Sequence, residues 1–391
     1  MLTQRFADAV VEAEKIIADA PHVRTEQDLV EGYDYLAGSI RASLMQAWAY
    51  QRDFPYFAQS TGPYTKLGLD NPDTLYFHAY LRDDAEYVVT GRRGSTADLS
   101  FQVLNGDYTP VDVPDSLTAF DDRAFDVDDD GRFEIRFGPA PPRSGNHRNY
   151  FRLAPGSAML IAREVYSDWG TEQRGRLQIH RADRVGAHPP ALTMDTMTQR
   201  YGVAGKILLS RLRTFLAFPQ RFYLDLPVNT LTEPRRTPGG LATQYSSVGH
   251  YDLDADTAMI VTVPRSDAPY QGFQLGSLWY VSLDYLNHQT SLTADQARTD
   301  PDGQIRYVIS ERDPGVANWL ECTGHRRGYL QIRWQRLSRE LTAADGPTVE
   351  LVGVHQLADR LPFHAANRIE PAEYTARIAA RQQAVAARMV F

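Results

Sequence analysis

The chain contains 391 residues, of which 43% are hydrophobic and 23% are charged. This length allows two or three domains with large cores, and the composition excludes a chain that is disordered or fibrous throughout. The 41 basic and 49 acidic residues give a formal net charge of −8, which argues against a nucleic-acid-binding surface that depends on overall basicity. A single cysteine, Cys322, excludes an intrachain disulfide and a multi-cysteine zinc site.

Targeting and membrane signals are absent from the sequence. Its first residues, MLTQRFADAVVEAEKII, contain several acids and lack the apolar core of a signal peptide. Apolar runs stay shorter than the roughly 18 residues that a membrane-spanning helix needs. We therefore expect a cytoplasmic protein with no membrane span.

Residues 1–51 carry the apolar spacing of two helices. The first stripe consists of Phe6, Val10, Ala13 and Ile17, and the second consists of Leu29, Tyr33, Leu36, Ile40, Leu44 and Trp48. Thr25 and Asp28 resemble a capping box at the start of the second helix. The next segment, FPYFAQSTGPYTKLGLDNPD, is rich in proline and glycine, which predicts a loop.

From Thr74 the apolar period changes towards two, which is typical of β-strands. The runs are TLYFHAYL, YVVTG, LSFQVL, RFEIRFG and AMLIAREVY in the first half, and MIVTVP, GSLWYVSLDY, QIRYVIS, GYLQIRWQRL and TVELVGV in the second. Between them, residues 193–217 have helical spacing, and the favoured interpretation is a linker helix packed on the sheets rather than a membrane-surface helix. A further helix is predicted from Pro371, because proline suits the first turn of a helix.

The two β-rich stretches resemble each other in order and spacing. SFQVL aligns with GFQLG, and DGRFEIRFG aligns with DGQIRYVIS. The glutamine and the first aspartate of these runs are 28 residues apart in both halves, from Gln102 to Asp130 and from Gln274 to Asp302. These matches predict an internal repeat of two similar β units packed together.

The elements together predict a mainly β protein with flanking helices, in the α+β class. We expect two similar β-sandwich or jelly-roll-like repeats, in whose alignment Arg163 matches Arg333. The expected organisation, in chain order, is a helical region (1–66), a first β domain (67–190), a helical linker (191–225), a second β domain (226–360) and a C-terminal helix (361–391).

Two groups of residues resemble the motifs of known families. The first-half motif consists of Asn71, Asp73, Thr74, Leu75 and Tyr76, and the second-half motif consists of Trp279, Asp302, Gly303, Asn318, Trp319, Leu320 and Arg333. Across most of residues 35–340 the chain is similar to the paired domain-of-unknown-function families numbered 1254 and 1214. The resemblance implies a β-sandwich fold and supplies no defined biochemistry.

An acidic segment, FDDRAFDVDDDGRFE, contains the opening of a calcium-binding loop. Asp126, Asp128 and Asp130 alternate ahead of Gly131, as carboxylates around one cation do. The twelfth position of such a loop, which needs a bidentate acid, is Phe137. A solvated Asp–Gly turn is therefore the favoured interpretation, and calcium is the alternative.

Other nucleophile and metal signatures are weak. The sequence has no Gly-x-Ser-x-Gly elbow, phosphate loop or dinucleotide fingerprint, and no organic cofactor is expected. Its 10 histidines form no His-x-x-x-His pair, although histidines of both repeats could meet at a metal in the fold. Cys322 near His325 suggests a reactive thiolate, but structural roles are favoured for this cysteine and for His78, His250, His288 and His325.

Polar residues beside aromatic ones are the strongest functional signal, because aromatic walls with a few converging polar groups form small-molecule pockets. We expect catalytic acid/base groups from Asp73, Tyr76 and His78, and substrate binding by Asn71, Asn318, Trp319 and Arg333. The predicted function is an enzyme (a lyase, isomerase or hydrolase) that acts on a small and partly apolar molecule. The alternative is a non-catalytic ligand-binding or assembly protein, and both interpretations leave a homo-oligomer open.

Overall fold

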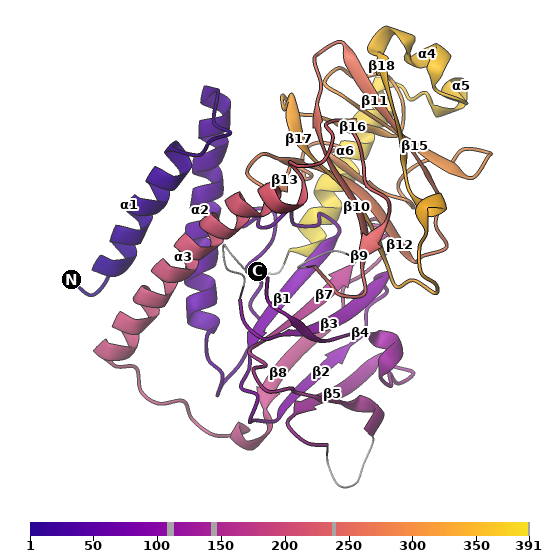
Figure 1. The fold of residues 1–391 in the computed structure, drawn as a ribbon. Coiled ribbons are helices and arrows are strands. Elements are labelled where there is room, and N and C mark those ends of the chain that lie inside the picture. The colour runs from indigo at the N-terminus through magenta and orange to yellow at the C-terminus, as the bar shows by residue number, and fades with distance from the viewer. Residues whose placement is uncertain (108–112, 142–146, 237–239, 390–391) are drawn as a thin grey trace.

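The computed structural model describes residues 1–107, 113–141, 147–236 and 240–389, and the fold is mainly β with flanking helices, as predicted. The helices are α1 (Gln4–Ala18), α2 (Glu26–Ala49), α3 (Met194–Phe222), α4 (Leu357–Arg360), α5 (His364–Asn367) and α6 (Pro371–Arg388). Figure 1 shows α1, α2 and α3 together along one flank of the molecule, and α6 running from the second β domain towards the first.

The first β domain is a sandwich of two sheets, with strand orders β1-β7-β3-β4 and β6-β5-β2-β8. Its strands are β1 (Thr74–Tyr80), β2 (Tyr87–Arg92), β3 (Asp98–Leu104), β4 (Ser116–Asp121), β5 (Arg132–Gly138), β6 (Tyr150–Arg152), β7 (Met159–Val165) and β8 (Arg176–Arg181). The facing sides of the sheets enclose a core rich in phenylalanine, in which Phe120 stacks on Phe151.

The second β domain repeats this architecture, with strand orders β13-β12-β17-β10-β9 and β16-β15-β11-β18, and with β14 paired to β12. Its strands are β9 (Arg235–Arg236), β10 (Tyr245–Asp252), β11 (Thr257–Pro264), β12 (Tyr270–Ser277), β13 (Val281–Ser282), β14 (Ser291–Thr293), β15 (Gln304–Ser310), β16 (Trp319–Glu321), β17 (Arg327–Gln335) and β18 (Thr348–Gly353). Phe273, Tyr307 and Trp334 contribute to its core.

The shared strand order confirms the predicted repeat. β10-β17-β12 corresponds to β1-β7-β3, and β16-β15-β11-β18 corresponds to β6-β5-β2-β8. The register also agrees, because Arg163 lies opposite Ser100 of β3 and Arg333 lies opposite Gly272 of β12. The two aligned arginines therefore occupy equivalent positions in the two sandwiches.

The helices α1, α2 and α3 pack on one another through the predicted apolar stripes. The capping box of Thr25 and Asp28 is present at the start of α2. In α3, Leu208 and Leu212 are fully buried within the cluster formed by these helices, which favours the packed linker helix over the membrane-surface helix.

One predicted strand, GSLWYVSLDY, is wrong. After β12 the chain turns at residues 278–280, and β13 has only two residues. Trp279 packs in the helical cluster, and Tyr280 stacks near Phe215 of α3. Trp279 and Tyr280 thus face the helices, whereas Leu283 lies in the core of the second sandwich.

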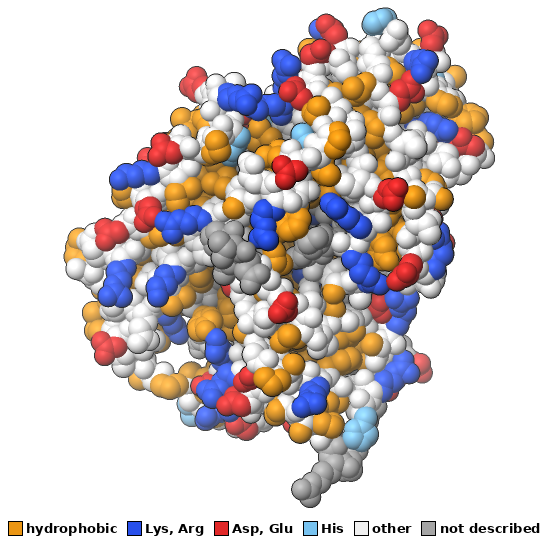
Figure 2. Space-filling view, in the orientation of Figure 1, with side chains coloured by type: hydrophobic (Ala, Val, Ile, Leu, Met, Phe, Trp, Pro, Cys, Tyr) orange, Lys and Arg blue, Asp and Glu red, His pale blue; other side chains and the backbone are white. Residues whose placement is uncertain are grey.

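The surface carries mixed charge. On the face drawn in Figure 2, basic and acidic side chains are interspersed. A nucleic-acid-binding face would instead gather its basic side chains into a patch or stripe. Within the described ranges, no helix is long and apolar enough to cross a bilayer.

The sheet faces that meet between the sandwiches are polar and yet buried. The polar side chains there are Gln102, Arg163, Gln274, Gln331, Arg333 and Gln335. Arg333 donates to Gln274 and to the carbonyl oxygen of Leu69 (2.5 Å), and Gln102 donates across the interface to the carbonyl oxygen of Gly240 (3.1 Å). Because buried polar groups must be paired, these bonds help to fix how the sandwiches are oriented.

An ionic cluster also joins the sandwiches at the start of β3. Arg336, beyond β17, forms an ion pair with Asp122 (2.9 Å) and donates to the carbonyl oxygen of Ala97 (3.1 Å). Asp98 is buried beside this pair, and its Oδ1 has no hydrogen-bond partner among the described residues. Burial, with the like charges of Asp121 and Asp122, raises the pKa of Asp98 to about 7.

We expect Asp98→Asn to reduce the pH dependence of stability. The ordinary pKa of this carboxyl is 3.8 and the folded-state pKa is about 7, so the folded protein binds more protons between these values. The free energy of unfolding of the wild type therefore falls as the pH rises through this window. Thermal midpoints measured from about pH 4 to about pH 8 should fall less in Asp98→Asn than in the wild type.

The exposed residue Asp129 offers a control, and Asp129→Asn should keep the wild-type pH profile. Identical pH profiles for Asp98→Asn and the wild type would contradict the raised pKa.

Candidate functional site

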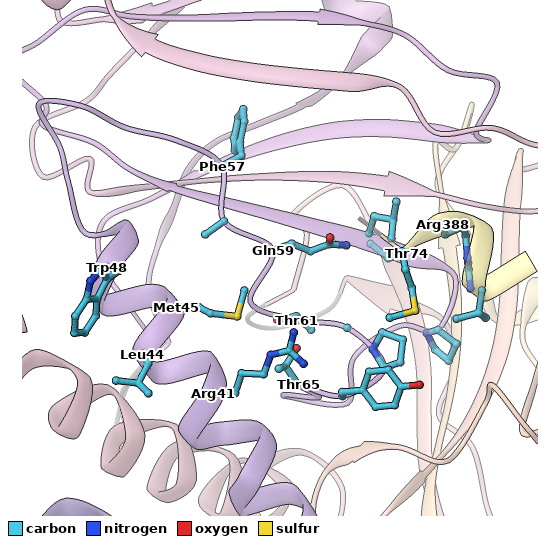
Figure 3. Close-up of a pocket in the computed structure, with 18 of the residues that line it drawn as sticks. Arg41, Leu44, Met45, Trp48, Phe57, Gln59, Thr61, Thr65, Thr74 and Arg388 are labelled. Atoms are coloured by element: carbon cyan, nitrogen blue, oxygen red, sulfur yellow. The ribbon is translucent and has the colours of Figure 1, made fainter. Parts of the chain in front are cut away.

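A cavity of about 720 Å³ lies where α2, the loop 56–65 and the end of α6 meet. Its largely apolar lining includes Leu44, Met45, Trp48, Phe57, Tyr201, Tyr285 and Val385, and Arg41 and Gln59 are among its polar residues. Figure 3 shows Trp48 of α2 at one end and Arg388 of α6 at the other. A volume of several hundred Å³ with mainly apolar walls is typical of a small-molecule pocket, and we name this space the apolar cavity.

Two local features of the sequence form this cavity. Leu44 and Trp48 belong to the predicted apolar stripe of α2, but both are only half-buried because they face the cavity rather than a packed core. The loop after α2 contains Gly62 and Pro63, which prevent another helix there and let the chain cross beside α2. Tyr64 in this loop is exposed at the rim.

A buried guanidinium lies at one end of the apolar cavity. Arg388 is 6% exposed, and its Nε and Nη1 have no hydrogen-bond partner among the described residues. Its guanidinium carbon lies 4.1 Å from the ring centroid of Trp169 and 4.9 Å from that of Tyr166. Burial lowers the pKa of Arg388, but a guanidinium keeps its charge in proteins. The cavity therefore ends at an unsatisfied cation.

Asp73, predicted to be catalytic, is a buried link between the two sandwiches. Its Oδ1 accepts a hydrogen bond from Trp169 Nε1 (2.8 Å) in the first sandwich, and its Oδ2 accepts one from the Tyr270 hydroxyl (2.7 Å) in the second. Asn71, predicted to bind substrate, donates to the same hydroxyl (2.8 Å). Burial raises the pKa of Asp73, against the opposing effects of these hydrogen bonds and of nearby arginines. Neither Asn71 nor Asp73 lines the apolar cavity.

Two cations of α6 share this one carboxylate. The guanidinium carbon of Arg381 lies 4.5 Å from the ring centroid of Trp169. Arg381 donates to the backbone carbonyl oxygen of Tyr285 and to both the backbone carbonyl oxygen and the hydroxyl of Ser291. The charge of Asp73 acts on both Arg381 and Arg388. The summed charge of the three groups is positive whether Asp73 is ionised or neutral. This environment favours an anion at the Arg388 end of the cavity.

The other predicted catalytic residues lie in a smaller cavity between the sandwiches. Tyr76 and His78 of β1 line it together with the equivalent arginines of the two repeats, Arg163 and Arg333. Its volume is about 140 Å³, and we name it the polar cavity. The polar cavity thus brings together three predicted site residues, Tyr76, His78 and Arg333, and Asp73 does not line it.

Thr61 and Thr74 line both cavities, so the two spaces adjoin at these side chains. Thr74 is 8% exposed, and its hydroxyl has no hydrogen-bond partner among the described residues.

The titration properties of Tyr76 and His78 differ from those of an ordinary acid/base pair. Burial, with the charges of Arg163 and Arg211, lowers the pKa of His78 to about 3, so this imidazole is neutral near pH 7. His78 therefore lacks the near-neutral pKa that suits a general base. Tyr76 accepts a hydrogen bond from the backbone N–H of Asn71 (3.0 Å), and burial raises its pKa. Its proton consequently stays on the oxygen.

Asn318 and Trp319 lie away from both cavities, within the second sandwich. The Asn318 side chain accepts from the backbone N–H of Arg298 (2.8 Å) and donates to the carbonyl oxygen of the same residue (2.8 Å). Trp319 packs against Tyr374 of α6, with ring centroids 5.3 Å apart, and donates to the carbonyl oxygen of Ser310 (3.0 Å). Their polar atoms are thus used inside their own repeat.

The acidic segment forms a turn closed by its own neighbours. Asp128 accepts hydrogen bonds from the backbone N–H groups of Asp130 (3.0 Å) and Arg132 (2.6 Å). Asp126 forms an ion pair with Arg148 (3.1 Å), and Asp130 forms one with Arg132. Nowhere in the described ranges is a group of three His, Cys, Asp or Glu side chains placed to hold a metal ion. The geometry is that of the favoured Asp–Gly turn.

The cysteine and two further histidines have structural surroundings. Cys322 is buried, and burial raises the pKa of its thiol to about 12, which favours the predicted structural role over a reactive thiolate. His325 pairs with Glu31 of α2 (2.8 Å), and His288 pairs with Glu321 (2.9 Å).

Arg388 and the cavity beside it were missed by the sequence analysis. The available signal was the spacing of the last helix, because Arg381 and Arg388 follow Tyr374 at intervals of seven residues and so share its buried face. A buried arginine on an apolar helix face marks a charge that needs a partner.

One solved structure among the comparisons with known proteins supports the fold. No protein-family model and no curated protein matches the sequence. The structure is similar to the crystal structure of an uncharacterized protein from Burkholderia cenocepacia, with a TM-score of 0.79 and 27% identity over 90% of this chain and 96% of that one. The VPA0106 protein from Vibrio parahaemolyticus matches with a TM-score of 0.46 and 12% identity over 87% of this chain and 100% of that one.

We expect Asp73→Ala to destabilise the protein strongly. The substitution leaves the buried Trp169 N–H and Tyr270 hydroxyl without their acceptor, and each such loss costs about 1–3 kcal/mol. Asp73→Asn keeps one acceptor oxygen and should lower the thermal midpoint less. The exposed Asp84→Asn variant is the control. Wild-type midpoints for both Asp73 variants would rule out the linking role.

Calcium should leave the thermal midpoint unchanged. Asp126, Asp128 and Asp130 already accept hydrogen bonds or ion pairs from protein groups, so an ion would have to displace them. The measurement is thermal unfolding in calcium and in chelator, because an ion that binds only the native state stabilises it. A higher midpoint in calcium that is lost in Asp128→Asn would restore the calcium interpretation.

Proposed function

We propose that the protein binds a small organic molecule with an apolar body and an anionic group in the apolar cavity. The observation that carries this proposal is Arg388, which faces a cavity of about 720 Å³ with two buried N–H groups that have no partner among the described residues. A buried charge without a partner is costly, so an anionic acceptor at this position would be stabilising.

The opposite end of the cavity suits the apolar body. Leu44, Met45 and Trp48 gather on α2, away from Arg388 (Figure 3). Apolar surface buried there would contribute about 25 cal/mol per Å². The class of ligand that fits both ends is a monocarboxylate with an aliphatic or aromatic body.

Binding rather than catalysis is the function that this lining supports. Of the described residues that line the apolar cavity, none is an aspartate, glutamate, histidine, lysine or cysteine. Burial raises the pKa of Tyr285 far above neutrality, so this phenol does not exchange its proton near pH 7. We therefore favour the ligand-binding alternative over an acid/base enzyme.

Acid/base catalysis is a second candidate, supported by the place of Tyr76. Its hydroxyl keeps a proton and lines the polar cavity, which adjoins the apolar cavity at Thr61 and Thr74. The test is to follow the NMR spectrum of a carboxylate incubated with the protein. A spectrum that changes with time in the wild type, but not in Tyr76→Phe, would favour the enzyme.

We also propose that the chain is related to the paired families numbered 1254 and 1214. Three residues of the resemblance, Asn71, Asp73 and Arg333, form hydrogen bonds that join the loop before β1 to the second sandwich. A common role in joining two sandwiches would explain why such residues recur at the matching motif positions.

Calorimetric titration with decanoate and decanol tests the binding proposal. The wild type should bind decanoate at least about tenfold more tightly than decanol, because a hydrogen bond to a charged group contributes about 1.5–3 kcal/mol. Arg388→Met keeps an apolar stem and removes the buried charge, so the preference for decanoate over decanol should fall.

Arg377→Met is the matched control, because Arg377 lies on the same helix, donates to the carbonyl oxygen of Ala317 (2.9 Å) and does not line the cavity. This variant should retain the preference for decanoate. Equal binding of decanoate and decanol by the wild type, or an unchanged preference in folded Arg388→Met, would overturn the proposal.

A further inference from the structure

The two repeats place equivalent arginines in one enclosed space. Arg163 of β7 and Arg333 of β17 come from matching positions of the two sandwiches, and both line the polar cavity. A sandwich that stood alone would hold such an arginine on an open sheet face. Only the pairing of the two domains brings both side chains to the same cavity.

Positive charge exceeds negative charge in this lining. Asp70 is the one carboxylate among the described lining residues, and its oxygens accept from the backbone N–H (3.1 Å) and the hydroxyl (2.9 Å) of Ser282. Arg163 and Arg333 therefore outnumber it, and His78 is neutral near pH 7. An oxyanion in the cavity would balance the charge.

The cavity also offers hydrogen-bonding groups that are not in use. Gln335 is 2% exposed, and its Oε1 has no hydrogen-bond partner among the described residues. The same holds for the hydroxyl of Thr74. Tyr76 accepts from Asn71 N–H, and its own proton has no acceptor within the described ranges. The cavity thus presents donors beside an unpaired acceptor, which are groups that could hydrogen-bond a bound molecule.

We propose that the polar cavity is a binding site for a small hydroxy acid, whose carboxylate faces Arg163 and Arg333 and whose hydroxyl donates to Gln335. The volume of about 140 Å³ suits a molecule of the size of glycolate. This site does not depend on the apolar cavity or on Arg388. The hydroxy acid is either a free molecule or the polar end of a longer ligand that passes Thr61 and Thr74.

Thermal unfolding and calorimetry with glycolate, acetate and chloride at equal ionic strength test this site. Glycolate should raise the wild-type midpoint more than acetate, and chloride should not raise it. Tyr76→Phe should weaken glycolate binding, and Gln335→Glu should weaken it at least about tenfold, because a second carboxylate would occupy the same charges. Tyr329→Phe is the control, because Tyr329 is buried and lines neither cavity. This variant should bind glycolate as tightly as the wild type does.

A hydroxy acid with a long chain distinguishes the two sources. If 2-hydroxydecanoate binds no more tightly than glycolate, the polar cavity takes a free molecule, and if it binds more tightly and displaces decanoate, the polar cavity takes the polar end of a longer ligand. The site is overturned if glycolate stabilises the wild type no more than acetate, or if folded Gln335→Glu binds glycolate normally. If a variant does not fold, the comparison of glycolate with acetate on the wild type still tests the site. If the wild type binds glycolate but not decanoate, the proposal for the apolar cavity fails and the proposal for the polar cavity stands.

Discussion

One buried carboxylate fixes the geometry on which the apolar cavity depends. Asp73 accepts hydrogen bonds from Trp169 of the first sandwich and Tyr270 of the second, and the same Trp169 ring carries two guanidinium groups of α6. A carboxylate buried in this way is tolerated only with donors and cations close by. The loop before β1, the second sandwich and α6 are therefore held in one arrangement, and these elements border the apolar cavity.

The repeat also explains why the domain interface is polar. In each sandwich one face of the β1-β7-β3 or β10-β17-β12 sheet packs on the core, and the other face would meet water in an isolated domain. Here those outer faces meet each other, and Gln102 and Arg333 reach across the interface to the backbone carbonyl oxygens of Gly240 and Leu69. The two halves differ at this position, because Tyr76 lies opposite Arg163 whereas Ser246 lies opposite Arg333.

Local patterns predicted most of the fold but little of the candidate site. Period-two runs located most of the strands, and matched spacing from Gln102 and Gln274 located the repeat, because these features depend on neighbouring residues. Trp279 and Tyr280 were assigned to a strand because their contacts with α2 and α3 leave no local trace. The lining of the apolar cavity combines α2 with α6, and no short window of sequence contains both.

The distance along the chain between α2 and α6 has a consequence for folding. Contacts between segments so far apart form only after the intervening sandwiches have brought them together, so the apolar cavity is among the last features to assemble. Opening α6 breaks fewer contacts than unfolding a sandwich does, and it exposes the cavity while the sheets stay intact. Such a partial opening would take Arg388 away from the cavity while both sandwiches stay folded.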